Sequence, residues 1–105
     1  KDFTSIKKDI ESIQKIIDSG RFSPTQKQTW ECLGVAFGTI LINEMDGMDW
    51  VTVIDGNKEY PALQFKDTDI MVYPTTLIWE KVKNNQPCNL AEEYKRIEAE
   101  VEAVL

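Results

Sequence analysis

The sequence predicts an α+β fold with two layers, in which helices pack on one face of a small three-stranded antiparallel meander. Apolar residues recur at helical spacing up to about residue 46 and again after residue 74, and they alternate between those points. Tight-turn residues separate the alternating segments, as expected for antiparallel strands. The expected order is therefore α-α-β-β-β-α-α, in a single domain over residues 1–105.

Two helices are predicted before the strands. Ser23 and Gln26 have the spacing of a capping box, with Pro24 at the first helical position, so the second helix should start there and run to about Asp46. An apolar stripe predicts the first helix, which should end at Gly20: Ile6, Ile10, Ile13 and Ile17.

Gly34 and Gly38 lie inside the second predicted helix, where each costs about 1 kcal/mol relative to alanine. They are four residues apart and so share one face of the helix. A face without side chains lets a neighbouring backbone come close. We expect the helix to cross another helix or the sheet there; a ligand approaching the backbone is the less favoured alternative.

Three strands and two further helices are predicted after Gly47. Residues 49–55, 59–65 and 70–73 read as strands, joined by turns at 56–58 and 66–69. Pro61 cannot donate a hydrogen bond to a neighbouring strand, so its strand should lie at an edge or the residue should face outward. A short helix is expected over 77–83, and a last helix follows Asn89 as its N-cap.

The charge is uneven along the chain. The formal net charge of −6 argues against nucleic-acid binding, which depends on Lys and Arg. Residues 46–105 hold twelve acidic and six basic side chains, whereas the preceding residues are balanced. This excess favours a cationic partner, although acidity for solubility alone is the alternative. No apolar run is long enough to cross a membrane, so no membrane association is expected. A cytoplasmic location is expected as well.

The residues that usually carry catalysis or bind metals are few. The absence of histidine excludes Ser-His-Asp and Cys-His triads and imidazole zinc sites, and two cysteines, expected to be free, cannot complete a thiolate site. Asp55, Asn57 and Glu59 resemble the start of a calcium loop, but Tyr60 and Lys66 replace its required glycine and glutamate. A hairpin turn is the better interpretation, and we expect no cofactor, no metal and no enzymatic activity.

The block from Trp30 to Pro74 resembles the bacterial domain-of-unknown-function family 3806. In that family a helix with Trp, Leu-Gly and Phe-Gly precedes a Trp-led strand, a segment ending in Pro-Ala-Leu, and an apolar strand that closes on proline. The resemblance implies the fold and no activity. By size and charge alone the chain is also similar to bacterial immunity proteins. The matching positions are Trp30, Leu33, Gly34, Phe37, Gly38, Trp50, Pro61, Ala62, Leu63 and Pro74.

The sequence therefore favours a non-enzymatic protein-binding module, and specifically an immunity-type inhibitor that occludes a basic toxin domain through an acidic face. The alternatives are a small carboxylate-dependent hydrolase, and a homo-oligomeric structural or interaction protein that associates through an exposed apolar patch. The oligomeric state is left open. Acidic residues in the predicted strands and turns would pair with the partner, and one tyrosine would supply buried contact area. These partner-binding candidates are Asp46, Asp49, Asp55, Glu59, Tyr60, Asp67 and Asp69.

Overall fold

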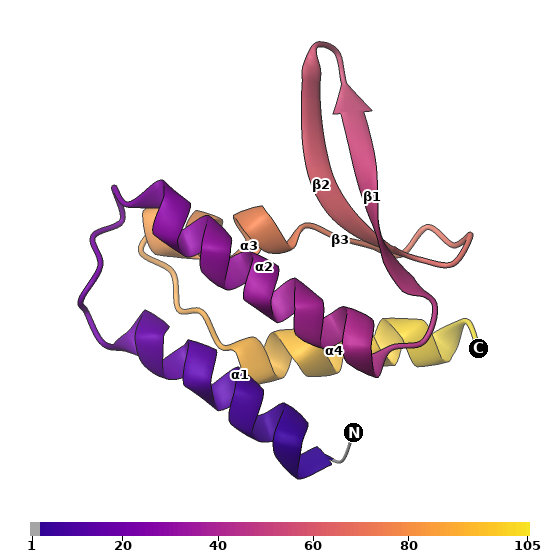
Figure 1. The fold of residues 1–105 in the computed structure, drawn as a ribbon, viewed down its shortest axis with the longest axis horizontal. Helices are drawn as coiled ribbons and strands as arrows, with labels where there is room; N and C mark the ends of the chain where they lie inside the picture. Colours follow the sequence, from indigo (N-terminus) through magenta and orange to yellow (C-terminus); the bar gives the residue numbers. More distant parts are fainter. Residues whose placement is uncertain (1–2) are drawn as a thin grey trace.

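Four helices and a three-stranded antiparallel sheet follow one another in the predicted order, α-α-β-β-β-α-α (Figure 1). The computed structural model describes residues 3–105. Each predicted strand and helix is present, with ends that differ from the prediction by a few residues. The elements are α1 (Phe3–Asp18), α2 (Lys27–Glu44), β1 (Met48–Asp55), β2 (Lys58–Phe65), β3 (Met71–Val72), α3 (Pro74–Lys83) and α4 (Leu90–Ala103).

The four helices and the base of the sheet share one apolar core. Helix α2 packs against both α1 and α3, and α1 also packs against α4. Burial of apolar surface, at about 25 cal/mol per Å², is the main force that holds these elements together. Phe37 and Leu41 of α2, Ile78 of α3 and Ile97 of α4 are completely buried in this core, together with Phe65 of β2.

The two glycines of α2 mark close approaches, as predicted. A Cβ atom on Gly34 would overlap the carbonyl oxygen of Pro74 and lie 2.7 Å from its carbonyl carbon. A Cβ atom on Gly38 would lie 3.0 Å from the Pro74 side chain and 3.1 Å from the ring of Trp50. Gly34 thus lets α2 cross the start of α3 against its backbone, and Gly38 makes room for the base of β1.

The predicted start of α2 is wrong by three residues. The backbone amide of Ser23 donates to the Gln26 side chain over 2.7 Å, which is one half of the expected capping box. The other half is missing, because the Ser23 hydroxyl accepts from the amide of Thr25 and not from that of Gln26. Residues 23–26 therefore close a turn, and α2 begins after it at Lys27.

The sheet is wide only at its base. Strand β1 pairs with β2 along eight residues, from Met48↔Phe65 to Asp55↔Lys58, whereas β3 pairs only with Leu63 and Gln64 of β2. The first five residues of β2, 58–62, pair with β1 alone. Pro61 lies in this part and is exposed, so its missing N–H group interrupts no ladder, and the prediction that the residue faces outward is confirmed.

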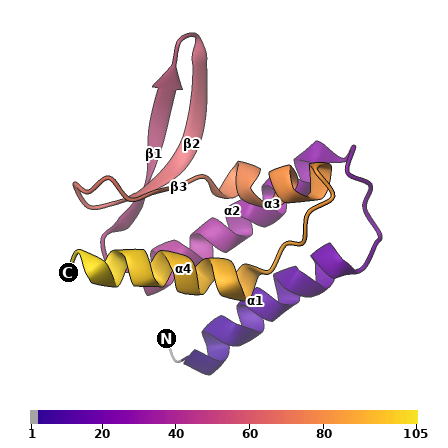
Figure 2. The ribbon, with the colours of Figure 1, turned by 180° about the vertical axis from the view of Figure 1, so that it is seen from behind.

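Residues 50–63, from the Trp50↔Leu63 pair to the turn, form a ribbon that has only two strands beyond that pair and is here named the hairpin arm. Figures 1 and 2 show from opposite sides that the arm rises away from the helices, while the base of the sheet meets α2 and α3. An isolated two-stranded hairpin is at best marginally stable in water. The ring of Trp50, seated beside Gly38 of α2, is therefore an important tie between the arm and the body.

Gln14 of α1 fastens the start of α4. Its side-chain amide donates to the carbonyl of Cys88 over 2.8 Å, and its oxygen accepts from the amide of Leu90 over 2.9 Å. The Asn89 side chain accepts from the amide of Glu92, which confirms Asn89 as the N-cap of α4. One α1 residue thus bridges to a segment more than seventy positions away.

Replacing Gln14 with alanine should lower the free energy of unfolding by about 2 kcal/mol, because it leaves two partly buried backbone groups without a partner. Urea unfolding followed by circular dichroism measures the change. Gln28→Ala is the matched control: this glutamine is exposed on α2, and its loss should cost less than about 0.5 kcal/mol. Equal losses in the two variants would contradict the assignment.

Among residues 3–105, none of the helices combines the length and the apolar character needed to cross a membrane.

Candidate functional site: the hairpin arm and its acidic groups

The acidic residues predicted from the sequence fall into two groups, one at each end of the hairpin. Asp55 and Glu59 lie at the tip, on either side of the Gly56–Asn57 turn. Asp49 lies six residues before Asp55 on β1, so the two residues are about 20 Å apart along the extended strand. The sequence leaves open whether these acids form one face; the structure separates them into two groups. The base group is Asp46, Asp49, Asp67 and Asp69.

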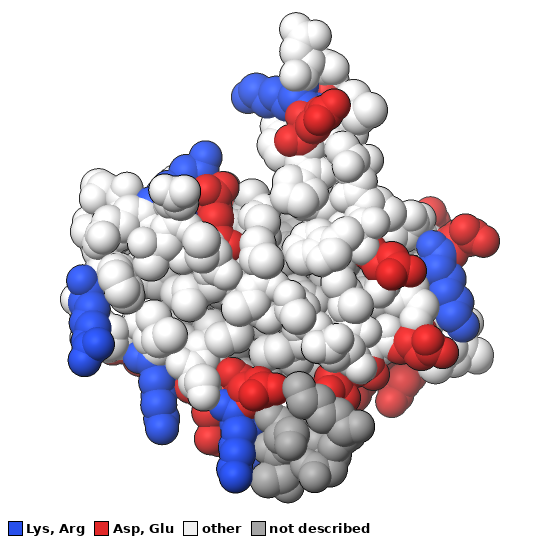
Figure 3. All heavy atoms as spheres, viewed as in Figure 1, with Lys and Arg blue, Asp and Glu red and all other residues white. Residues whose placement is uncertain are grey.

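All six of these carboxylates are exposed, and none belongs to an ion pair recorded among the described residues. By contrast, Glu93 of α4 is bound by Arg96 at 2.9 Å and by Lys81 at 3.5 Å. Residues 46–69 contain only two basic side chains, Lys58 and Lys66, and their net charge is −4. Figure 3 shows acidic side chains on the arm and, separately, at the end of the body below it. The local negative charge is thus largely left for solvent or a partner.

Tyr60, the predicted contact residue, is half-buried beside a hollow between the arm and the start of α3. The hollow has a volume of about 490 Å³. Tyr60 pairs with Val53 across the strands, and Tyr73 and Thr76 approach from the far side. Tyr73 itself is 41% exposed. The lining residues are Val53, Ile54, Asp55, Tyr60, Tyr73 and Thr76.

Two apolar side chains of the arm are exposed and were not predicted as partner-binding residues. Ile54 is 70% exposed, and Trp50 is 39% exposed. Both lie on the same face of β1, since they are an even number of residues apart. No local sequence signal indicated this exposure, because it follows from the length of β3: two residues, against eight in β1, leave the outer part of the β1–β2 pair without a third strand. The arm therefore offers apolar area as well as negative charge.

The comparisons with known proteins give the family. The model of a domain of unknown function, DUF3806, matches residues 9–94, which is most of the chain. The chain belongs to the DUF3806 family. The resemblance drawn from Trp30 to Pro74 is therefore confirmed, and the matched range includes the whole hairpin arm with both acidic groups.

A solved crystal structure of a protein from Bacteroides thetaiotaomicron VPI-5482 is similar to this DUF3806 chain. The two are 45% identical and superpose with a TM-score of 0.76. The similarity covers 90% of this chain but 35% of that protein, so the chain spans about a third of the other's length. No functionally curated protein matches the chain.

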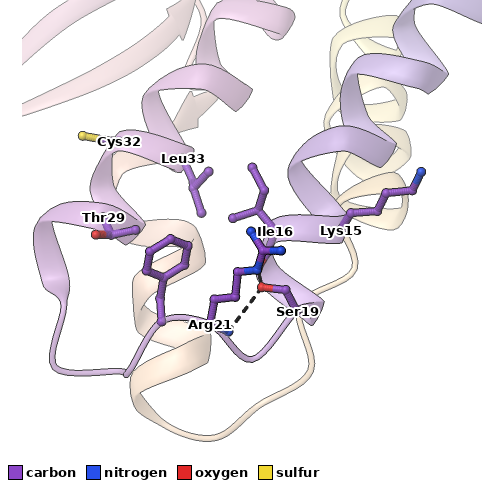
Figure 4. Close-up of a pocket in the computed structure, with 8 residues that line it drawn as sticks. Lys15, Ile16, Ser19, Arg21, Thr29, Cys32 and Leu33 are labelled. Atoms are coloured by element: carbon purple, nitrogen blue, oxygen red, sulfur yellow. Dashed lines mark hydrogen bonds between the residues drawn. The ribbon is translucent and has the colours of Figure 1, made fainter.

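A second hollow in this DUF3806 chain lies between the end of α1 and the start of α2, and has a volume of about 630 Å³. Figure 4 shows Arg21 extending toward Ile16, while Lys15 and Cys32 point away from the centre. Phe22 and Leu33 are half-buried in its wall. The hollow is thus an apolar depression with two cations near it. None of the residues predicted as partner-binding lines it.

Neither cysteine of the DUF3806 chain forms a disulfide. Cys32 is exposed on α2, whereas Cys88 is partly buried just before α4. Burial raises the pKa of the Cys88 thiol to about 11; Lys81 opposes this effect, and Glu93 and Asp18 add to it. Cys88 is therefore almost entirely protonated near pH 7 and is a poor nucleophile there. Within residues 3–105, no group of three acidic or thiol side chains is placed to hold a metal ion.

Proposed function

We propose that this chain is a non-enzymatic binding module for a basic protein, and that the hairpin arm with its two acidic groups is the binding surface. The observation that supports this most directly is the set of six exposed carboxylates without an ion pair among the described residues. An immunity-type inhibitor that occludes a basic toxin domain is the specific form of the proposal.

Charge and apolar area have different roles in this proposal. Exposed carboxylates at the arm attract a cationic protein over several ångströms and speed its encounter. Trp50, Ile54 and Tyr73 are exposed beside them and supply the area that holds a complex together once it has formed. A typical stable interface buries about 800 Å² on each partner, so binding would extend from the arm to its base.

Charge reversal at the tip tests the proposal. In Asp55→Lys/Glu59→Lys, the association rate with the partner should fall at least tenfold at low salt, and the difference should shrink as salt is added. The partner is first captured by cross-linking in extract of the native host, identified by mass spectrometry and purified. Surface plasmon resonance then gives rates for both proteins over a salt series.

Glu11→Lys/Glu102→Lys is the matched control. It makes the same change in net charge at exposed positions on α1 and α4, outside both acidic groups. Its association rate should fall less than threefold. If both double variants slow association equally, or if the captured partner is itself acidic, the hairpin arm is not the binding surface and the proposal fails.

A further inference from the structure

The outer edge of β1 has unpaired backbone groups in the middle of the arm. In an antiparallel pair, alternate residues exchange hydrogen bonds with the partner strand. The amide of Lys66 donates to the carbonyl of Gly47 over 2.9 Å, which fixes the alternation: odd-numbered β1 residues bond to β2. The N–H and C=O groups of Trp50, Thr52 and Ile54 therefore point outward.

This edge lacks the features that usually protect a free strand. Its register with β2 runs without a bulge, and residues 50–54 contain neither proline nor a charged side chain. In Figures 1 and 2 no other element lies along the outer side of β1. The sequence of this segment, Trp-Val-Thr-Val-Ile, has high strand propensity. The edge is thus a template on which one more strand can form.

A second copy of this chain is a poor occupant. Two β1 edges can pair antiparallel with all three outward residues only in one register. In that register Thr52 lies opposite Thr52, and Trp50 of each copy lies opposite Ile54 of the other. In this register Asp49 lies opposite Asp55 of the second copy, at both ends of the pairing. Like charges directly opposite one another destabilise a sheet. The two acids therefore discourage self-pairing while leaving the edge open to a cationic strand.

We infer that the β1 edge receives an extended, cationic segment of the partner protein, which adds as a fourth strand to the sheet. This inference rests on the proposed function and names the mode of recognition. The segment carries Lys or Arg at two positions six residues apart, opposite Asp49 and Asp55, because those acids lie on one face of β1. Between them, Val51 and Val53 on the same face favour small apolar residues.

A synthetic peptide built to these rules is the probe: Lys-Thr-Val-Thr-Val-Thr-Lys with blocked ends. The peptide runs antiparallel to β1, so its first lysine faces Asp55 and its last lysine faces Asp49. Its second, fourth and sixth residues exchange hydrogen bonds with Ile54, Thr52 and Trp50. Titration into the ¹⁵N-labelled chain should shift the amide resonances of these three residues most. It should also slow their hydrogen exchange at least tenfold at saturation, because each amide gains an acceptor.

Two peptide controls separate backbone pairing from charge. N-methylation at the second, fourth and sixth positions removes the donors that face β1 and should weaken binding at least tenfold. N-methylation at the third and fifth positions modifies donors that face away and should weaken it less than threefold. Replacing both lysines with glutamate should abolish detectable binding.

Each outcome decides a different claim. If the lysine peptide binds at the arm but both methylated peptides bind equally well, strand addition is wrong and the charge-based proposed function stands. If the lysine and glutamate peptides bind equally, the cationic requirement fails. If the lysine peptide leaves Trp50, Thr52 and Ile54 unperturbed, the inference is overturned, while the proposed function is still decided by the tip reversal.

Discussion

Gly34→Ala should be strongly destabilising, with a net loss of about 2 kcal/mol in the free energy of unfolding. The added Cβ would overlap the carbonyl oxygen of Pro74, which is backbone and cannot rotate away. The helices α2 and α3 must separate to relieve the overlap, and overpacking of this kind typically costs 1–3 kcal/mol and sometimes more. Alanine's better helix propensity returns only about 1 kcal/mol of that loss.

The matched control is Gly38→Ala, which adds the same methyl group to the same face of α2. There the neighbours are side-chain atoms, the Pro74 ring and the tip of Trp50, which can shift by a few tenths of an ångström. The net change should stay within about 1 kcal/mol, because the helix gains propensity. Urea midpoints at constant m-value compare the two variants. A Gly34→Ala protein as stable as Gly38→Ala would refute the close crossing at Pro74.

Trp50→Ala should both destabilise the protein, by about 2–3 kcal/mol, and release the hairpin arm from the body. Its ring is 39% exposed, so less is lost than the roughly 3–5 kcal/mol for a fully buried tryptophan. The local effect should be larger than the global one, because a two-stranded ribbon without support is marginal. Amide exchange of residues 51–55 should accelerate much more than exchange in α2.

Ile54→Ala serves as the control for that prediction, since it lies on the same face of the same strand and is 70% exposed. It should change the free energy of unfolding by less than about 0.5 kcal/mol and leave amide exchange in the arm nearly unchanged. Hydrogen-exchange mass spectrometry reports both variants in one experiment. If Trp50→Ala left the arm as protected as Ile54→Ala does, the ring would not be its tie to α2.

The fold was largely predictable because local signals agreed with one another. The alternation in 49–55 and 59–65, the Gly56–Asn57 turn and the Asn89 cap each depend on residues near in sequence, and each appears in the structure. The start of α2 was mispredicted for a related reason. The capping-box pattern of Ser23 and Gln26 also suits a closed turn, and the turn forms instead of a first helical turn.

The arrangement of the candidate site was harder to predict from the sequence, because it depends on how much of each strand is covered by a neighbouring strand or helix. Sequence spacing places Asp49 and Asp55 on one face of their strand. It does not show that β3 has only two residues, which leaves the outer parts of β1 and β2 without a third strand beside them. The same fact explains why Trp50 is not fully buried. The bond between Gln14 and Cys88 spans most of the chain, and no local pattern could have indicated it.

The crossing at Gly34 also governs how the arm is presented. Pro74 follows the last strand after a single residue, so the close contact between its carbonyl group and α2 helps to fix the angle at which the sheet leaves the helices. Among the side chains of the arm, Trp50 also contacts α2, at Gly38. Substitutions at exposed side chains of the arm, such as Thr52 and Ile54, should therefore change what the arm contacts and leave its angle to the helices unchanged.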